Sequence, residues 1–179
     1  MLVTRAQKTE WGSYSDRRNS FDDDDDIKRF MMMVHNDTSL KDYLRSFIPK
    51  GTFSFKPKPD GQYGVDLGLF SEQGNPVATI DIERWSAWKD DWPSYYKHIH
   101  FLGRKEKFLN QHDAPFFMAF LNYTRKKVIM ISQKDIDKYP TINKYFSYKK
   151  VADRVRELPM SEGHIFGENI TTREQGLFV

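Results

Sequence analysis

The chain contains no cysteine among its 179 residues. This absence excludes disulfide bonds, cysteine-containing zinc sites and thiol catalysis. No apolar run approaches the roughly 18 residues that a membrane-spanning helix needs. The first 20 residues also lack the apolar centre of a secretory signal. We therefore expect no association with membranes, and a location in the cytoplasm, which would be that of the host cell if the gene is phage-encoded.

Several common enzyme motifs are also missing from the sequence. It holds no G-x-S-x-G, no P-loop and no G-x-G-x-x-G, so serine-hydrolase, nucleotide-hydrolase and dinucleotide-binding functions have no support. Hydrophobic residues make up 39% of the chain and aromatic residues 15%, which is enough for the core of one domain. We expect a flexible N-terminal tail over residues 1–20, a single domain over 21–168 and a C-terminal tail over 169–179.

Charge is unevenly distributed along the chain. The net charge is +3, and leaving out the five aspartates of Asp22–Asp26 raises it to +8. From Lys97 to Arg156 there are 14 basic and 5 acidic residues, together with many aromatic ones. Such a basic segment suits a polyanionic partner such as nucleic acid. A solvated surface explains the same charges equally well.

Hydrophobic spacing predicts the order of the elements. Helical spacing covers residues 22–34, 38–48, 99–111 and 133–139. Alternating or continuously apolar strand patterns cover residues 51–58, both flanks of 65–85, 115–122, 127–132 and a short stretch near 165. The aspartate run would cap the first helix or remain solvated, and a metal-binding or DNA-mimicking patch is its functional alternative. Residues 142–158 remain ambiguous. This order predicts an α/β (α+β) fold with a central mixed sheet flanked by helices.

The segment 65–85 contains an acidic hairpin. A turn centred on Gln73–Gly74 would place Asp66 directly opposite Asp81 across the two strands. Glu83 lies two residues beyond Asp81 and therefore projects from the same face. Three carboxylates should thus converge on one side of the hairpin.

Facing carboxylates repel each other, because cross-strand Cβ atoms lie only about 4.5–5.5 Å apart. Gly64 and Gly68 flank Asp66 and leave that face open. A divalent cation such as Mg²⁺ is the simplest way to relieve the repulsion, since it takes carboxylate, water and phosphate oxygens. Two alternatives stay open: a face that meets solvent, with Arg84 or lysines pairing the acids, or a β-bulge that shifts the register.

Asp66, followed across a hairpin by Asp81-Ile82-Glu83, resembles the motif of the PD-(D/E)XK (restriction-endonuclease-like) nuclease superfamily. The resemblance extends to element order over Phe30–Ser132. It implies a restriction-endonuclease-like fold and Mg²⁺-dependent (or Mn²⁺-dependent) phosphodiester hydrolysis of DNA by an endonuclease or nicking nuclease. A phage or mobile-element role would suit the size of the chain.

The resemblance also implies roles for individual residues. Asp66, Asp81 and the Ile82 carbonyl would bind the metal. Glu83 occupies the family's lysine position, where it would be a ligand or would orient the attacking water. Lys105 would supply the missing positive charge, which makes it a catalytic candidate. Because the lysine is replaced, a non-catalytic nucleic-acid-binding or assembly protein on a degenerate nuclease fold is the alternative. A structural protein with a merely solvated hairpin is the third.

A nuclease needs cations to hold the phosphate backbone. Eleven basic residues are candidates for this surface: Lys97, Arg104, Lys105, Lys107, Arg125, Lys126, Lys127, Lys149, Lys150, Arg154 and Arg156. Concerted cutting of both strands would need a homodimer.

Two further groups of residues lie near the hairpin in the sequence. His98 and His100 could bind a transition metal, but positions at an element edge or facing DNA fit them better. The aromatic group comprises Trp85, Trp88, Trp92, Tyr95 and Tyr96. We expect these rings to cover an edge of the core, and stacking on bases is the alternative.

Overall fold

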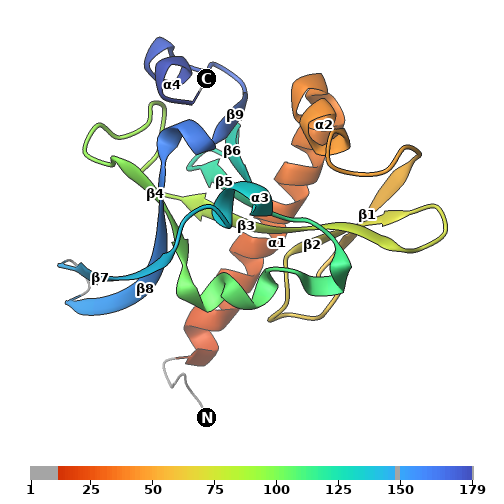
Figure 1. The fold of residues 1–179 in the computed structure, drawn as a ribbon, viewed down its shortest axis with the longest axis horizontal. Coiled ribbons are helices and arrows are strands. Elements are labelled where there is room, and N and C mark those ends of the chain that lie inside the picture. The colour runs from red at the N-terminus through yellow and green to blue at the C-terminus, as the bar shows by residue number, and fades with distance from the viewer. Residues whose placement is uncertain (1–11, 148–149, 179) are drawn as a thin grey trace.

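The computed structural model describes residues 12–147 and 150–178, with side chains from residue 22 onward. Its framework is a six-stranded sheet in the order β1-β2-β3-β5-β6-β9 (Figure 1). The strands are β1 (Phe53–Pro57), β2 (Leu67–Ser71), β3 (Pro76–Trp85), β5 (Phe116–Asn122), β6 (Lys127–Ser132) and β9 (His164–Gly167). Strands β3 and β5 are parallel, and the other neighbouring pairs are antiparallel. The predicted α/β class with a mixed central sheet is confirmed at this level.

A second, three-stranded antiparallel sheet diverges from the first, in the order β4-β8-β7 (Figure 1). Its strands are β4 (His98–Leu102), β7 (Thr141–Phe146) and β8 (Val151–Pro159), and this resolves the ambiguous segment 142–158 as a hairpin. The predicted helix over 99–111 is wrong. That segment forms β4, the 3₁₀-helix η1 (Gly103–Phe108) and the short 3₁₀-helix η2 (Gln111–Asp113).

The reason for the missed strand is visible in the side-chain pattern of β4. Burial alternates along its five residues, with Ile99 and Phe101 buried and their neighbours more exposed, which is the two-residue period of a strand. Gly103 then lets the chain pass close to β8, since a Cβ there would lie 2.7 Å from the Arg154 carbonyl oxygen. The lysine-rich stretch after it is wound as a 3₁₀-helix.

The α-helices are α1 (Gly12–Asn36), α2 (Thr38–Arg45), α3 (Gln133–Ile136) and α4 (Thr172–Phe178). Helices α1 and α2 cover one face of the large sheet, and the predicted stripe of Ile27, Phe30 and Val34 is buried there. The aspartate run was expected to cap this helix. Because α1 begins at Gly12, the run lies in the middle of the helix and caps nothing. Residues 1–11 of the expected N-terminal tail lie outside the described residues.

The other face of the large sheet packs against the second sheet, the 86–97 loop and α4. Phe116 and Met118 of β5 meet Trp88, Leu158 and Phe178 in this second core. Phe178 is only 4% exposed. The segment 169–179 was expected to be a tail, but its described part carries α4, which is packed into the domain.

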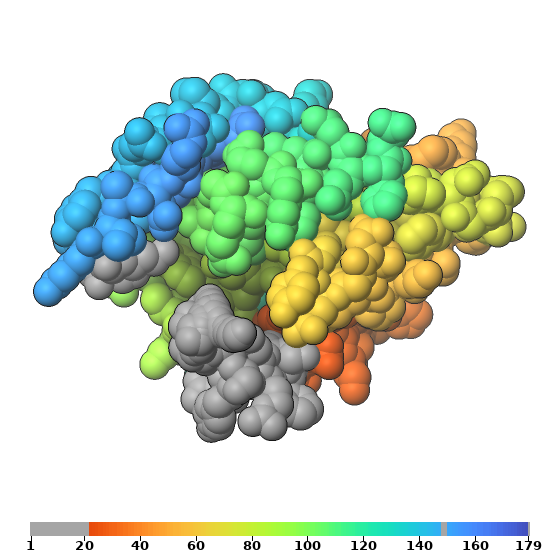
Figure 2. All heavy atoms as spheres, turned by 90° about the horizontal axis from the view of Figure 1, so that it is seen from below, coloured from red at the N-terminus to blue at the C-terminus, as the bar shows by residue number. Residues whose placement is uncertain are grey.

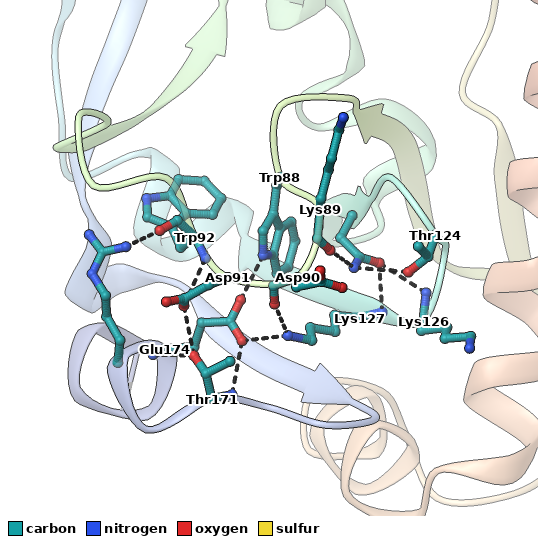
Figure 3. A network of polar contacts seen from close by, with 12 residues as sticks. Trp88, Lys89, Asp90, Asp91, Trp92, Thr124, Lys126, Lys127, Thr171 and Glu174 are labelled. Carbon is teal, nitrogen blue, oxygen red and sulfur yellow. Dashed lines mark hydrogen bonds and ion pairs between the residues drawn. The ribbon is translucent and has the colours of Figure 1, made fainter.

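A buried polar network fastens α4 to the rest of the molecule (Figure 3). Glu174 is fully buried and accepts hydrogen bonds from Trp88 Nε1 at 2.6 Å and Lys127 Nζ at 2.7 Å. Lys127 also donates to the Asp90 carbonyl oxygen, and the Thr171 amide donates to Glu174 at 3.0 Å. Helix α4, the 86–97 loop and strand β6 are thereby joined at one point.

The β2–β3 hairpin has the predicted register near its open end. Its pairs there are Leu67 with Ile80, Gly68 with Thr79 and Leu69 with Ala78. The turn is one residue longer than expected: the Ser71 amide donates to the Asn75 carbonyl at 2.9 Å, so three residues lie between this pair, and Gly74 takes a φ of +83°. A β-bulge beside Phe70 takes up the difference and restores the register.

Candidate functional site

The carboxylates of Asp66 and Asp81 meet where β2 begins. Asp66 directly precedes β2, and continuing the observed register by one residue sets it opposite Asp81. Its Oδ2 accepts a hydrogen bond from the Ile82 amide at 2.8 Å, and its carboxyl group shares a hydrogen bond with Asp81. The structure therefore brings together the pair that the sequence predicted.

The carbonyl of Ile82 faces the same place. The Thr79 amide donates to the Pro115 carbonyl on the β5 side, so the Ile82 amide, three residues on, points to the opposite side. A strand residue presents its N–H and C=O to the same neighbour. The Ile82 carbonyl thus points past the end of β2 toward Asp66, as expected of a ligand beside the two carboxylates.

The Asp66 carboxyl group is held in a strongly unfavourable environment for a charge. Burial raises its pKa to about 8, with a further contribution from the charge of Asp81, while the hydrogen bond from Ile82 works in the opposite direction. Without a cation, the Asp66–Asp81 pair consequently keeps a proton at neutral pH.

Lys105 lies against the same carboxylates. It belongs to η1, is 6% exposed, and places its Nζ 2.5 Å from Asp81 Oδ2 and 3.2 Å from Glu83 Oε1. Burial alone would lower the pKa of this ammonium group, but Asp81 and Glu83 outweigh it and the pKa is raised. The lysine is therefore charged, and it reaches the site from the crossover between the parallel strands β3 and β5, not from the α-helix that was expected.

A fourth carboxylate, which the sequence did not assign to this site, is that of Asp23 in the aspartate run of α1. Burial raises the pKa of Asp23, and the charges of Asp81 and Lys105 also act on it. Asp26 turns instead to Arg125, whose Nε lies 2.5 Å from its Oδ1. The signal available in the sequence was the length of the run, since one or two aspartates suffice for a cap.

These groups line a polar cavity of about 440 Å³ between α1, η1 and the loop before β2. Asp22, Asp23, Asp26, Asp66, Asp81, Ile82, Glu83, Arg84, Arg104, Lys105 and Lys107 are among the residues that line it. Figure 2 shows η1 in green on this side of the molecule, between the β7–β8 hairpin in blue and the loop before β2 in yellow. We name this space the carboxylate cavity, and it combines anionic groups at one wall with cations at another.

The donor set of the carboxylate cavity suits a hard cation. No three or more His, Cys, Asp or Glu residues within 12–147 and 150–178 are already grouped to hold an ion. Mg²⁺, however, ordinarily takes only one or two protein carboxylates and completes its shell with water and phosphate oxygens. The paired Asp66 and Asp81, with the Ile82 carbonyl beside them, meet that requirement.

The basic residues predicted for the nucleic-acid surface divide into two groups. Arg104 and Lys107 are exposed and line the carboxylate cavity. Four others are also exposed but do not line the carboxylate cavity: Lys97, Lys126, Lys150 and Arg154. Lys149 lies outside the described residues.

The second group of basic residues is committed to structural contacts. Lys127, predicted for the surface, is instead buried with Glu174. Arg125 is engaged by the aspartates of α1. Arg156 makes a two-pronged contact with Glu106 at 2.7 and 2.8 Å. These three side chains are not available to phosphate in this arrangement.

Glu83 also lines a second cavity, together with both predicted histidines and part of the aromatic group. His100 Nε2 is 2.9 Å from Glu157 Oε2, which indicates a partner in the protein in place of a metal. Trp88 and Trp92 are buried in the core, as the sequence predicted. Trp85 and Tyr96 are only half-buried, and Tyr95 is 72% exposed. The aromatic group therefore covers the core only in part.

Asp66→Asn is expected to stabilise the metal-free protein at high pH. Since the folded-state pKa is raised from 3.8 to about 8, the folded chain keeps a proton that the unfolded chain has lost between these pH values. Wild-type stability should fall as pH rises through this window and stay low above it. At pH 8.5 in EDTA, the variant should be more stable by about 2 to 4 kcal/mol.

Urea unfolding at pH 4.5 and pH 8.5 measures this difference, with Asp42→Asn on the exposed face of α2 as the matched control. The gain should shrink toward pH 4.5, and Mg²⁺ should stabilise the wild type at pH 8.5 but not the variant. An unchanged or reduced stability of Asp66→Asn at pH 8.5 would contradict the cost assigned to a buried Asp66 charge beside Asp81.

No family model, curated protein or solved structure matches this chain. No helix among the described residues is long and apolar enough to cross a membrane.

Proposed function

We propose that this protein is a metal-dependent nuclease that hydrolyses phosphodiester bonds in DNA. The observation that carries the proposal is the pair of facing carboxylates, Asp66 and Asp81, with the ammonium of Lys105 2.5 Å from Asp81 in a polar cavity. Paired carboxylates that keep a proton in the absence of a cation are arranged to release it when a divalent ion binds. The resemblance to the PD-(D/E)XK superfamily is consistent with the same chemistry.

Asp66, Asp81 and the Ile82 carbonyl would hold Mg²⁺ or Mn²⁺. When bound, such an ion lowers the pKa of a coordinated water and offsets charge on the phosphate. Glu83 is half-buried at the edge of the cavity, where its carboxylate can accept a proton from the attacking water or orient it. As the water oxygen adds to phosphorus, the bond to the leaving oxygen breaks, and that oxygen takes up a proton from solvent water to leave as an alcohol.

Lys105 would have two effects in this reaction. It holds Asp81 and Glu83 in a fixed relation, because its ammonium contacts both carboxylates. It also brings a full positive charge to a buried position, where charge that develops on the phosphate is stabilised more strongly than in water. The family motif has a lysine at the position of Glu83. In this chain, Lys105 on the crossover would supply that positive charge beside the carboxylates.

Arg104 and Lys107 are expected to bind phosphates of the bound strand. Removing each charge, as in Arg104→Gln or Lys107→Gln, should weaken binding to all sequences alike. The slope of log K against log[salt] should fall by about 0.7 to 0.9 for each phosphate that is no longer neutralised. Fluorescence anisotropy over a salt series measures the slope, with Lys134→Gln as the control, since Lys134 is exposed and does not line the cavity. Unchanged slopes for both variants would contradict the assigned surface.

The proposal is tested by incubating the protein with supercoiled plasmid, linear duplex DNA, single-stranded DNA and single-stranded RNA. Each reaction contains Mg²⁺, Mn²⁺ or EDTA. Cleavage that requires the metal supports a nuclease, and the preferred substrate defines its class. Salt-dependent binding without cleavage of any substrate would instead favour the non-catalytic binding protein. The absence of both would favour the structural protein with a solvated hairpin.

A further inference from the structure

A second cavity, of about 230 Å³, lies on the other side of Glu83 from the Asp66–Asp81 pair. Aromatic rings form much of its wall, including those of Trp85, Tyr96 and Phe146. It is set in the angle where the second sheet diverges from the large one, because β4 and β7 supply one side and β3 the other. We name it the aromatic cavity.

The aromatic cavity adjoins the carboxylate cavity. Glu83 and Arg104 line both of them. A ligand with one part at the carboxylates could therefore extend a second part between the rings without leaving the protein. Arg104, at the boundary, is exposed and can meet an anion that links the two parts.

The aromatic wall is fixed before any ligand arrives. The ring of Trp85 lies 4.3 Å from that of Tyr96 and 4.6 Å from that of Trp92, measured between centroids. Trp92 Nε1 donates to the Tyr96 carbonyl at 3.2 Å, and Arg173 of α4 donates to the Trp92 carbonyl. The network around Glu174 anchors the same loop from behind (Figure 3). The rings therefore lose little freedom on binding.

The charges around the cavity indicate what it binds. Ring faces alone attract a cation, and unpaired acidic groups beside them would strengthen that attraction while positive charges oppose it. Here Glu83, which lines the cavity, is paired with Lys105, and nearby Glu157 is paired with His100 and Lys144, while Arg104 adds a further positive charge. Flat aromatic walls beside a cation match a nucleobase that carries its own phosphate, since bases stack on such rings.

We propose that the aromatic cavity takes one unpaired nucleobase of the strand whose phosphodiester lies at Asp66 and Asp81. The inference rests on the proposed nuclease function and specifies its substrate. A base inside a duplex is stacked on both faces and paired along one edge, so only a single-stranded or extruded base can insert between the aromatic walls of this cavity. The preferred substrates are consequently single strands, flaps or junctions with an unpaired nucleotide beside the cut.

The first test uses the intact protein and needs no cleavage. The ligands are a series of short single-stranded oligonucleotides with the same fluorescent label at one end. Each contains one abasic residue, at a different position along the strand. Removal of one stacked base should weaken binding roughly 5- to 100-fold at one or two positions only. Anisotropy in EDTA measures this pattern. Equal affinity for all abasic positions and for the complete strand would overturn the aromatic cavity as a base site.

The second test compares variants in the same assay. Trp85→Ala removes one aromatic wall of the cavity, and Leu102→Trp fills the cavity with a ring from β4. Two different changes are used so that the test still gives a result if one variant does not fold. Tyr95→Ala is the control, because Tyr95 is exposed beside Tyr96 but does not line the cavity. Both cavity variants should lose the position-dependent effect, while the control keeps it. A pattern that survives in a folded cavity variant would contradict the proposal.

The two proposals fail in different ways. Metal-dependent cleavage at rates unaffected by abasic residues would leave a nuclease without a base site. A position-dependent weakening of binding without cleavage under Mg²⁺ or Mn²⁺ would leave a base site on a protein that does not cut.

Discussion

Asp81→Asn is expected to reduce metal-dependent cleavage at least about 1,000-fold, which corresponds to about 4 kcal/mol of lost transition-state stabilisation. Asp81 stands at the centre of the site, since its carboxylate meets both Asp66 and Lys105. Asparagine keeps the shape but not the charge. It can still accept a hydrogen bond from Lys105, whereas it is a much poorer ligand for a hard cation. Single-turnover cleavage at saturating protein measures the reduction directly.

The control for this variant is Asp113→Asn. Asp113 is exposed on the same crossover, does not line the carboxylate cavity and has a positive φ that asparagine tolerates. It should cleave like the wild type. If Asp81→Asn binds DNA and retains full metal-dependent cleavage, the site is wrongly assigned and the activity comes from elsewhere.

Glu174→Ala is expected to destabilise the protein by about 3 to 5 kcal/mol, because it leaves the buried ammonium of Lys127 without its ion-pair partner. The same change removes the acceptor of Trp88 Nε1. For a chain of this length, the destabilisation should lower the melting temperature by about 10 °C. Thermal unfolding followed by circular dichroism measures it.

Two further variants separate the charge from the packing. Gln175→Ala changes the exposed neighbour of Glu174 on α4 and should leave the melting temperature nearly unchanged. The double variant Glu174→Leu with Lys127→Met removes both charges and should recover much of the stability that Glu174→Ala lacks. If Glu174→Ala unfolds at the wild-type temperature, α4 does not contribute to the fold as described.

The hairpin register was predictable from the sequence because a strand has a period of two. A slip by one residue would move Ile80 and Ile82 out of the core and Asp81 into it, so burial of one face fixes the pairing. This holds even though the turn was predicted one residue too short. The β-bulge beside Phe70 corrects the difference before the pairing reaches Asp66.

The remainder of the site depends on tertiary packing that local patterns do not contain. Asp23 reaches the cavity because α1 packs on β3, and nothing in the spacing of the aspartates states where that helix crosses the sheet. Lys127 and Arg156 resemble surface cations in the sequence, since their partners Glu174 and Glu106 lie about 50 residues away in the chain. Charge counts along a segment thus overstate the cations available to DNA.

The two outer strands of the large sheet have a consequence for self-association. Strand β1 forms one edge of the sheet. It carries the charged Lys56 and also Pro57, which has no amide hydrogen to donate to an added strand. Strand β9 forms the other edge, is four residues long, and lies against α2 and α4. Unpaired edges invite strand addition from a neighbouring molecule unless they are short, charged, interrupted or covered. The large sheet is thus protected against edge-to-edge pairing, and a dimer able to cut both DNA strands would have to form through a different surface.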